Sequence, residues 1–387
     1  MRVVIVGAGP VGTLLGAELA RLGVEHVTLE AREAPGAGSR AIGIHSAALS
    51  AMSASGVTDR ILAACLQVRE GEARVGGRTV TTIRFGAVRT GSLASFPFVA
   101  TLPQAATEAA IAGAAADHGA AAPQRGIRVL EVIDEGSSCR VITDRGEVRG
   151  DAVVIAAGSR SRRISSLTRD GKRRAYPDRY VMADAPDDTD DGPRAIVHLH
   201  PDGVLESFPL PGGLRRYVAW HRPGSTATAT DDAATLRDAV SRRAGSSADM
   251  ITTATTFGVG RFVARRMLRG RVLAIGDAAH EVSPIGGQGL NLGLIDAATL
   301  APLLGEWSSA GEQPAALAAW ERRRRAAART AARIAALNTV AGRGHTGLGA
   351  ATRLAGIRVA PARLLAHAYG MGFDPDARTS PLTPQTR

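Results

Sequence analysis

A glycine-rich turn close to the N-terminus carries the first pattern with chemical meaning. Residues 7–12 read Gly-Ala-Gly-Pro-Val-Gly and follow an apolar segment, residues 3–6, that is typical of a buried strand. Gly7 permits a tight turn, Gly9 allows the backbone to approach a pyrophosphate, and Gly12 allows a helix to pack closely on the strand. The N-terminus of that helix would offer unpaired N–H groups to an anion.

Glu30 gives this turn a more specific meaning. It ends the next expected strand, 18 residues after Gly12. A carboxylate at this place can accept hydrogen bonds from the ribose of adenosine, whereas a glycine-rich surface turn needs no acidic residue there. The pattern predicts a dinucleotide site, but FAD and NAD share this fingerprint.

A second glycine-rich segment, residues 271–293, favours FAD. An expected strand leads to Gly276 and Asp277, whose carboxylate can bind sugar hydroxyls. A loop with Gly286 and Gly287 then begins a helix, which directs N–H groups and the positive end of the helix dipole at a developing anion. A flavin develops such an anion at its N1/O2 edge on reduction.

These segments resemble the class A flavoprotein hydroxylases, the p-hydroxybenzoate hydroxylase family. Residues 271–293 resemble the family's GD motif, residues 39–45 its arginine-bearing FAD segment, residues 102–104 its FAD-binding glutamine, and residues 209–213 a strand-turn motif of its substrate sheet. The resemblance covers roughly residues 1–335. It implies that FAD is bound by Gly7, Gly9, Gly12, Glu30, Arg32, Arg40, Gln104, Gly158, Asp277, Pro284, Gly287, Gln288, Gly289, Leu290 and Asn291. No catalytic side chain is certain; Pro284, Gly286 and Gly287 form the loop nearest the flavin.

The resemblance also implies the fold class. We expect an α/β protein with a Rossmann-like FAD-binding domain of the p-hydroxybenzoate hydroxylase (GR2) type, a substrate domain built on an antiparallel sheet, and C-terminal helices. The FAD-binding domain would comprise residues 1–70, 99–168 and 259–335, and the substrate domain residues 71–98 and 169–258. Residues 336–387 would form a C-terminal helical segment and tail. The acidic stretch 184–191 is expected to be a surface loop.

One position departs from the family pattern. The family's middle motif usually reads Asp-Gly-x-x-Ser and serves both FAD and the nicotinamide cofactor, but this chain has Ala157 before Gly158. The missing aspartate predicts slow reduction of the flavin by NADH or NADPH.

The expected substrate strands carry apolar residues where p-hydroxybenzoate hydroxylase has polar ones. Aligned on residues 200–203, the substrate-contacting positions are Val197, Phe208, Leu210 and Val218. An apolar site suits a large fused-ring substrate better than a small benzoate. A histidine on or near these strands (His198, His200 or His221) is a candidate base toward a phenol, although exposed strand positions are the commoner role.

The predicted activity follows from the resemblance. NADH or NADPH would reduce FAD, O2 would then form a flavin C4a-hydroperoxide, and one oxygen atom would pass to a bulky aromatic substrate of polyketide type in secondary metabolism such as antibiotic biosynthesis. Baeyer–Villiger oxygenation, epoxidation and flavin-dependent reduction are alternatives, and Ala157 leaves open a redox-inactive flavoprotein that only binds a ligand. A halogenase is disfavoured because Lys172, the only lysine, is far from the early position that such enzymes use.

Composition excludes several other classes. The 387 residues carry a formal charge of +11, but the arginines are scattered without interleaved aromatic residues, so nucleic-acid binding is not expected. The arginine run 322–325 is expected to be a solvated helix face. The two cysteines predict neither a disulfide framework nor a metal site. With no signal peptide or apolar membrane span, we predict a cytoplasmic monomer or homodimer.

Overall fold

The N-terminal glycine turn lies inside a β-α-β unit. The computed structural model describes residues 1–34, 36, 41–88, 91–169, 173–221, 232–246, 248–344 and 362–378. Strand β1 (Arg2–Val6) leads into the turn, and helix α1 (Pro10–Arg21) begins directly after it. Pro10 suits the first helical position because its missing N–H would have no partner there. Strand β2 (Glu25–Glu30) then runs parallel to β1.

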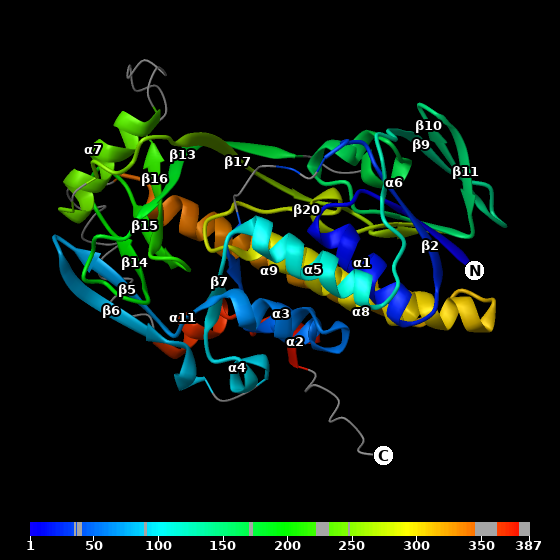
Figure 1. Ribbon diagram of the computed structural model, residues 1–387, viewed down its shortest axis with the longest axis horizontal. Helices are drawn as coiled ribbons and strands as arrows, with labels where there is room; N and C mark the ends of the chain where they lie inside the picture. The colour runs from blue at the N-terminus through cyan, green and yellow to red at the C-terminus, as the bar shows by residue number, and fades with distance from the viewer. Residues whose placement is uncertain are drawn as a thin grey trace.

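A six-stranded sheet extends from this unit. Its order is β18-β19-β12-β1-β2-β8, and all neighbours are parallel except the edge pair β18-β19. The added strands are β8 (Gln124–Arg125), β12 (Ala152–Ile155), β18 (Leu268–Arg269) and β19 (Val272–Ala274). β12 is buried along its whole length, as expected for a central parallel strand. Helices α1, α5 (Gln104–Asp117) and α8 (Gln288–Ala310) pack together beside the sheet and share its apolar core (Figure 1).

A second sheet of eight strands forms the other end of the molecule (left in Figure 1). Its order is β20-β17-β13-β16-β15-β14-β5-β6, antiparallel except between β14 and β5. The strands are β5 (Glu70–Val75), β6 (Arg78–Arg84), β13 (Arg174–Pro186), β14 (Arg194–His198), β15 (Leu205–Leu210), β16 (Leu214–His221), β17 (Thr255–Val263) and β20 (His280–Glu281). Helix α7 (Asp232–Ala244) covers one face through an apolar core that includes Leu205, Tyr217 and Leu236. Because side chains alternate along a strand, the intervening residues point to the opposite face.

Smaller elements complete the two halves. Two three-stranded sheets have the orders β11-β10-β9 and β3-β7-β4. Their strands are β9 (Val129–Asp134), β10 (Cys139–Thr143), β11 (Gly146–Gly150), β3 (Gly43–Ile44), β7 (Val99–Thr101) and β4 (Leu66–Val68). The short helices are α2 (Ser46–Ala51), η1 (Ser53–Ser55), α3 (Val57–Ala64), η2 (Phe85–Ala87), α4 (Ser92–Ser95), η3 (Ser159–Arg163), α6 (Ser166–Arg169), η4 (Gly276–Ala278) and η5 (Pro375–Arg378).

The C-terminal helices are joined closely to both halves. Helix α9 (Ala316–Gly342) runs without interruption across the boundary predicted between residues 335 and 336. Helix α11 (Ala362–Tyr369) packs against β6 and η2. Strand β17 likewise crosses the boundary predicted between residues 258 and 259. The predicted division into domains remains a prediction. The hairpin β5-β6 lies in the same sheet as the strands between residues 174 and 263, with which it was grouped from the sequence.

Two charged segments differ from the sequence-based expectation. Within the arginine run 322–325, Arg322 and Arg323 are exposed, but Arg324 is completely buried and bonds to Asp296 and Asp374. The prediction of a solvated face was therefore wrong for Arg324, whose charge is compensated by buried carboxylates.

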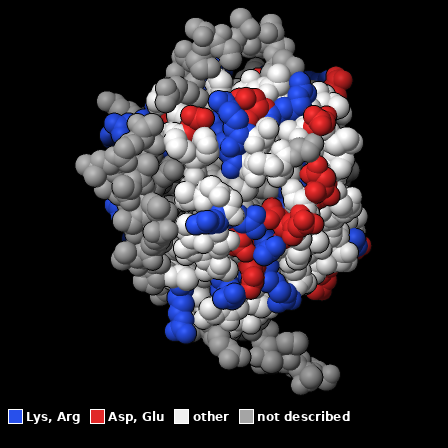
Figure 2. Space-filling view, turned by 90° about the vertical axis from the view of Figure 1, so that its left-hand side faces the viewer, with Lys and Arg blue, Asp and Glu red and all other residues white. Residues whose placement is uncertain are grey.

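The acidic stretch 184–191 was expected to be a surface loop. Its first residues instead extend β13 as far as Pro186, and Asp184 forms an ion pair with Arg216 on β16. Farther along, Asp191 bonds to Arg74 on β5. Basic and acidic side chains are interspersed on the end of the molecule shown in Figure 2, so opposite charges largely face one another there.

Candidate active site

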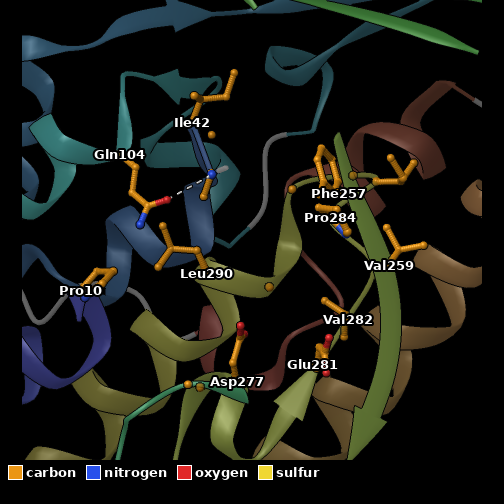
Figure 3. A pocket seen from close by; sticks show the side chains of 18 of the residues that line it. Pro10, Ile42, Gln104, Phe257, Val259, Asp277, Glu281, Val282, Pro284 and Leu290 are labelled. Atoms are coloured by element: carbon orange, nitrogen blue, oxygen red, sulfur yellow. Dashed lines mark hydrogen bonds between the residues drawn. The ribbon is translucent and has the colours of Figure 1, made fainter. Parts of the chain in front are cut away.

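One cavity of about 1160 Å³ connects the two sheets. One part of its wall comes from the glycine turn, the carboxyl ends of β2 and β12, and the segment 276–290. Another part comes from strands β13 to β17 of the eight-stranded sheet. Figure 3 shows Gln104, Pro10, Asp277 and Leu290 around one side of this cavity, and Phe257 with Pro284 on the other.

The three glycines of the first turn have three different surroundings. Gly7 adopts a φ of +107°, and a Cβ atom there would lie 2.6 Å from Cα of Ala157. A Cβ atom on Gly12 would lie 1.9 Å from the carbonyl oxygen of Gly7, so this glycine serves helix–strand packing and does not line the cavity. At Gly9 a Cβ atom would meet nothing within 4 Å, because this residue borders open space. The open space therefore lies at the N-terminus of α1, where an anion is stabilised.

Glu30 is held as a carboxylate at the edge of this space. Its oxygens accept hydrogen bonds from the backbone N–H of Ala8 (2.8 Å) and of Arg32 (2.9 Å), and from Nε of Arg32 (3.1 Å). Burial opposes its charge, but the bonds from Arg32 and Ala8 outweigh burial and lower the pKa of Glu30. An ionised carboxylate beside the helix terminus suits sugar hydroxyls. Arg40 lies outside the described residues.

Gln104 closes the neighbouring wall. It begins helix α5, and its Oε1 accepts a hydrogen bond from the N–H of Ala41 at 3.4 Å (Figure 3). Its Nε2 donates to Glu108 at 2.9 Å. The side chain thus fixes the segment after residue 40 at the cavity rim.

Asp277 lines the cavity from the short helix η4 (Figure 3). Asp296 fixes the start of this helix through a hydrogen bond to Gly276. The carboxylate of Asp296 on α8 is fully buried and accepts bonds from the N–H of Gly276 (3.0 Å) and from His280 (2.6 Å). Burial opposes its charge, but His280 and Arg324 outweigh burial and keep its pKa low. No role for Asp296 was predicted from the sequence. His280 bonds to this carboxylate, so its contact is structural.

The loop that precedes α8 divides into residues that line the cavity and residues that hold the loop. Pro284, Gly286, Gly287, Gly289 and Leu290 belong to the first group. The side chain of Asn291 is buried and bonds to the backbone of His45, Gly43 and Gly287. Gln288 donates to the carbonyl of Ala368 at 3.1 Å. The side chains of Gln288 and Asn291, which were predicted to bind the cofactor, are therefore engaged with the protein itself.

The eight-stranded sheet supplies the other wall. Of the four residues predicted to contact the substrate, Val197, Phe208 and Val218 line the cavity, whereas Leu210 is buried elsewhere at the end of β15. Arg32 and Gly158 also line the cavity. None of His198, His200 and His221 does so among the described residues.

Two charged residues on the substrate wall were missed by sequence reasoning. Arg216 is paired with both carboxylate oxygens of Asp184, at 2.6 and 2.8 Å. Glu206 is buried and faces the cavity, and burial raises its pKa to about 7. The alternation of β15 could have indicated Glu206, since it lies two residues before Phe208 on the same face.

The open groove along Gly9, the ionised Glu30 and the N-termini of α1 and α8 together fit an elongated anionic dinucleotide. The FAD binding domain family matches residues 1–335. The chain belongs to this family. The cofactor of the site is therefore FAD, and the resemblance to class A FAD-dependent aromatic hydroxylases is confirmed. Among the described residues, no cluster of side chains could hold a metal ion, and no helix is long and apolar enough to cross a membrane.

Several known proteins are similar to this flavoprotein. An uncharacterized aromatic compound monooxygenase of Bacillus subtilis (strain 168) is 30% identical over 77% of the chain and 60% of its own length. The 12-dehydrotetracycline 5-monooxygenase/anhydrotetracycline 6-monooxygenase of Streptomyces rimosus is 29% identical over 84% of the chain and 66% of its own length. The p-nitrophenol 4-monooxygenase of Pseudomonas putida has the same fold, with a TM-score of 0.81 at 20% identity over 95% of this chain and 97% of that one. The chain thus spans less than two thirds of the length of the relatives from Bacillus subtilis and Streptomyces rimosus.

Proposed function

We propose that this protein is an FAD-dependent monooxygenase that hydroxylates a bulky, hydrophobic, polyketide-like aromatic substrate. The observation that carries the proposal is the continuous cavity: the same space that borders the FAD-binding residues is walled by apolar strand residues of the second sheet. The relative from Streptomyces rimosus is a monooxygenase of 12-dehydrotetracycline and anhydrotetracycline, which supports a bulky substrate with fused rings.

The residues of the chain have distinct parts in this reaction. Glu30 and Asp277 would hold hydroxyl groups of the cofactor, and the open backbone at Gly9 would receive its pyrophosphate. The N-terminus of α8 would stabilise negative charge beside the loop at Gly286 and Gly287. When bound, FAD supplies the redox chemistry that activates dioxygen.

The substrate wall would position the aromatic ring and exclude water. Val197, Val218 and Phe257 present apolar surface to the cavity. Pro284 lines the cavity beside Phe257 (Figure 3). Water exclusion favours transfer of oxygen to the substrate over loss to side reactions. No side chain is required to act as a nucleophile.

We further propose that O2 is the co-substrate, that NADH or NADPH is the reductant, and that the protein is a monomer or homodimer of the cytoplasm. The predicted FAD contacts of Gly7, Gly9, Glu30, Arg32, Gln104, Gly158, Asp277 and the loop 284–290 belong to the same proposal, which their position around the cavity supports.

The experiment that tests the proposal begins with the spectrum of the purified protein. We expect a yellow protein with non-covalent FAD that oxidises NADH or NADPH faster when a polycyclic phenol is present. Mass spectrometry of the product should show one added oxygen as a ring hydroxyl. A lactone or an epoxide would assign one of the alternative oxygenations, and a flavin that is never reduced would assign a ligand-binding protein. A preparation that takes up NAD but no flavin would contradict the proposal.

A further inference from the structure

An acidic residue stands in the middle of the apolar substrate wall. Strand pairing aligns Val197, Glu206, Val218 and Met182 in one row across β14, β15, β16 and β13. All four side chains line the cavity. A carboxyl group therefore faces the substrate space with apolar neighbours on both sides in its row.

Glu206 differs from the other carboxyl groups that line this cavity. Glu72 accepts bonds from Arg74 and Thr79, and Glu281 is paired with Arg173. Among the described residues, no hydrogen bond or ion pair engages the carboxyl group of Glu206, and burial alone shifts its pKa. Burial of an unpaired carboxyl group costs free energy unless a ligand supplies its partner.

Among the residues that the structure describes, none offers Glu206 a compensating charge. Tyr180 on β13 and Tyr369 on α11 are the titratable groups that its charge affects, and burial, with Glu206 second, raises the pKa of both phenols. Both tyrosines are therefore neutral near pH 7. Arg216 also lines the cavity, in the next row of cavity-facing residues, where it lies opposite Phe208. Its guanidinium group is already paired with both carboxylate oxygens of Asp184.

We propose that Glu206 is a specificity-determining residue that accepts a hydrogen bond from a hydroxyl group of the aromatic substrate. The inference rests on the proposed function and narrows its substrate class to fused-ring phenols. A plain hydrocarbon would leave the buried carboxyl group without a partner. Where Glu206 is ionised, a carboxylated ring would bring a second acceptor of like charge against it, so the ionised form of Glu206 disfavours benzoate-type substrates.

The test uses the FAD-loaded protein and four probes that share one ring system. These are naphthalene, 2-naphthol, 2-naphthoate and 2-(aminomethyl)naphthalene. Binding is measured at about pH 8.5, where Glu206 is mostly ionised, by equilibrium dialysis and by the perturbation of the flavin spectrum. We expect 2-naphthol to bind about tenfold more tightly than naphthalene and 2-naphthoate, as one hydrogen bond to a buried carboxyl group allows. Glu206→Leu should reduce this preference to less than about threefold.

Glu206→Gln separates the hydrogen bond from the charge. Its amide oxygen can still accept from 2-naphthol, so the preference over naphthalene should persist in part, whereas the exclusion of 2-naphthoate should weaken. A purely structural role for Glu206 would change the binding of all four probes alike. Glu131→Gln, an exposed residue on β9 with the same change in charge, is the matched control and should bind as the wild type does.

Several outcomes would overturn the inference. Equal binding of 2-naphthol and naphthalene, no binding of any naphthyl probe, or an unchanged preference in Glu206→Leu would each do so. Tightest binding of 2-(aminomethyl)naphthalene would show that the partner of Glu206 is a cation instead of a hydroxyl group. FAD content, measured first on each variant, separates these failures from a failure of the proposed function, since the latter would appear as a protein without flavin.

Discussion

Glu30 and Glu206 line the same cavity, but the pKa values of their carboxyl groups are shifted in opposite directions. Both are buried, but Glu30 receives bonds from Ala8 and Arg32 that hold it ionised. Glu206 lies among apolar side chains, so its pKa rises to about 7. Glu30 has hydrogen-bond donors that Glu206 lacks, and these donors lower its pKa in spite of burial. One cavity thereby combines a fixed negative charge at the FAD end with a group that can be neutral or charged at the substrate end.

The raised pKa of Glu206 predicts a pH-dependent stability. Its pKa is about 7 in the folded protein against 4.5 for an unperturbed glutamate. Between these values the unfolded chain has released a proton that the folded protein retains, so the contribution of Glu206 to stability falls as the pH rises. Glu206→Gln does not titrate. From about pH 5 to about pH 8 the variant should therefore gain up to about 3 kcal/mol relative to the wild type.

Urea denaturation of the wild type and of Glu206→Gln at both pH values measures this difference. Because all other titrating groups are common to the two proteins, the comparison isolates Glu206. Stabilities that change in parallel over this pH range would show that the carboxyl group is already ionised in the folded protein at pH 5.

Ala157 governs a second prediction at the scale of one residue. It follows β12, is exposed, and lines the cavity where the family usually has an aspartate. Its backbone supports Gly7 closely, but its side chain borders open space that an aspartate could enter. Ala157→Asp should speed reduction of the flavin by NADH or NADPH without substrate by about tenfold, the effect of one charge-assisted hydrogen bond. The substitution should not change the range of substrates.

Stopped-flow absorbance of the flavin measures this rate, with Ala157→Asn as a control of nearly equal size without the charge. In the wild type, reduction should be slow and should accelerate when the aromatic substrate is bound, because closure around the substrate orders the site. If the wild type is already reduced rapidly alone and Ala157→Asp changes nothing, Ala157 is a neutral replacement.

At the scale of elements, the first β-α-β unit separates a glycine for the cofactor from a glycine for the fold. Gly9→Ala places its methyl group in open space at a φ of −77°, which alanine adopts freely. The variant should fold with stability within about 0.5 kcal/mol of the wild type but bind FAD at least about tenfold more weakly, since the methyl group enters the pyrophosphate space. Gly12→Ala directs its methyl group at the carbonyl of Gly7, 1.9 Å away, and should cost about 1–3 kcal/mol of stability.

Flavin titration and urea denaturation of both variants provide the measurement. The two variants serve as controls for each other, because each changes one glycine to alanine within four residues of the other. Loss of stability in Gly9→Ala, or full stability in Gly12→Ala, would reverse the assignment of the two roles.

The sequence predicts those elements whose signals are local. The turn at residues 7–12, the strand before it and the glutamine at the start of α5 are fixed by neighbouring residues, and the structure contains them. The direction of a side chain depends on partners far along the chain. Asn291 turns away from the cavity because the backbone near Gly43, in β3, offers it hydrogen bonds. The pairing of β15 with β14 and β16, which places Glu206 in the cavity, is equally non-local.

Arg324 shows a signal that the sequence did contain. In α9 the buried positions include Leu317, Trp320, Arg324, Ala327, Ala328, Ala331 and Ala335. Their spacing of three and four residues marks one helix face, and Arg324 is in phase with it. The density of charge in the run 322–325 suggests an exposed face, but the spacing of the apolar residues around Arg324 is the stronger indicator.

At the scale of the whole molecule, Arg324 joins the FAD-binding half to the C-terminal segment. Its guanidinium bonds to Asp296 on α8 at 2.7 Å and to both oxygens of Asp374 at 2.7 and 2.8 Å. Burial opposes its charge, but Asp296 and Asp374 outweigh burial and raise the pKa of Arg324. Since Asp296 also accepts from the N–H of Gly276, the network reaches the residue that precedes Asp277 at the cavity.

Removal of Arg324 should therefore destabilise the protein and weaken its hold on FAD. Arg324→Ala leaves Asp374 buried without a counter-charge and leaves Asp296 with His280 alone, which we expect to cost about 3–5 kcal/mol of the free energy of unfolding. Urea denaturation of the FAD-loaded protein measures this loss, and flavin fluorescence after dilution measures release of FAD. Arg322→Ala, an exposed neighbour in the same helix, should change stability by less than about 0.5 kcal/mol. Equal effects of the two variants would mean that the buried carboxylates are satisfied without Arg324, and unchanged FAD release in Arg324→Ala would mean that the network stops short of the cofactor site.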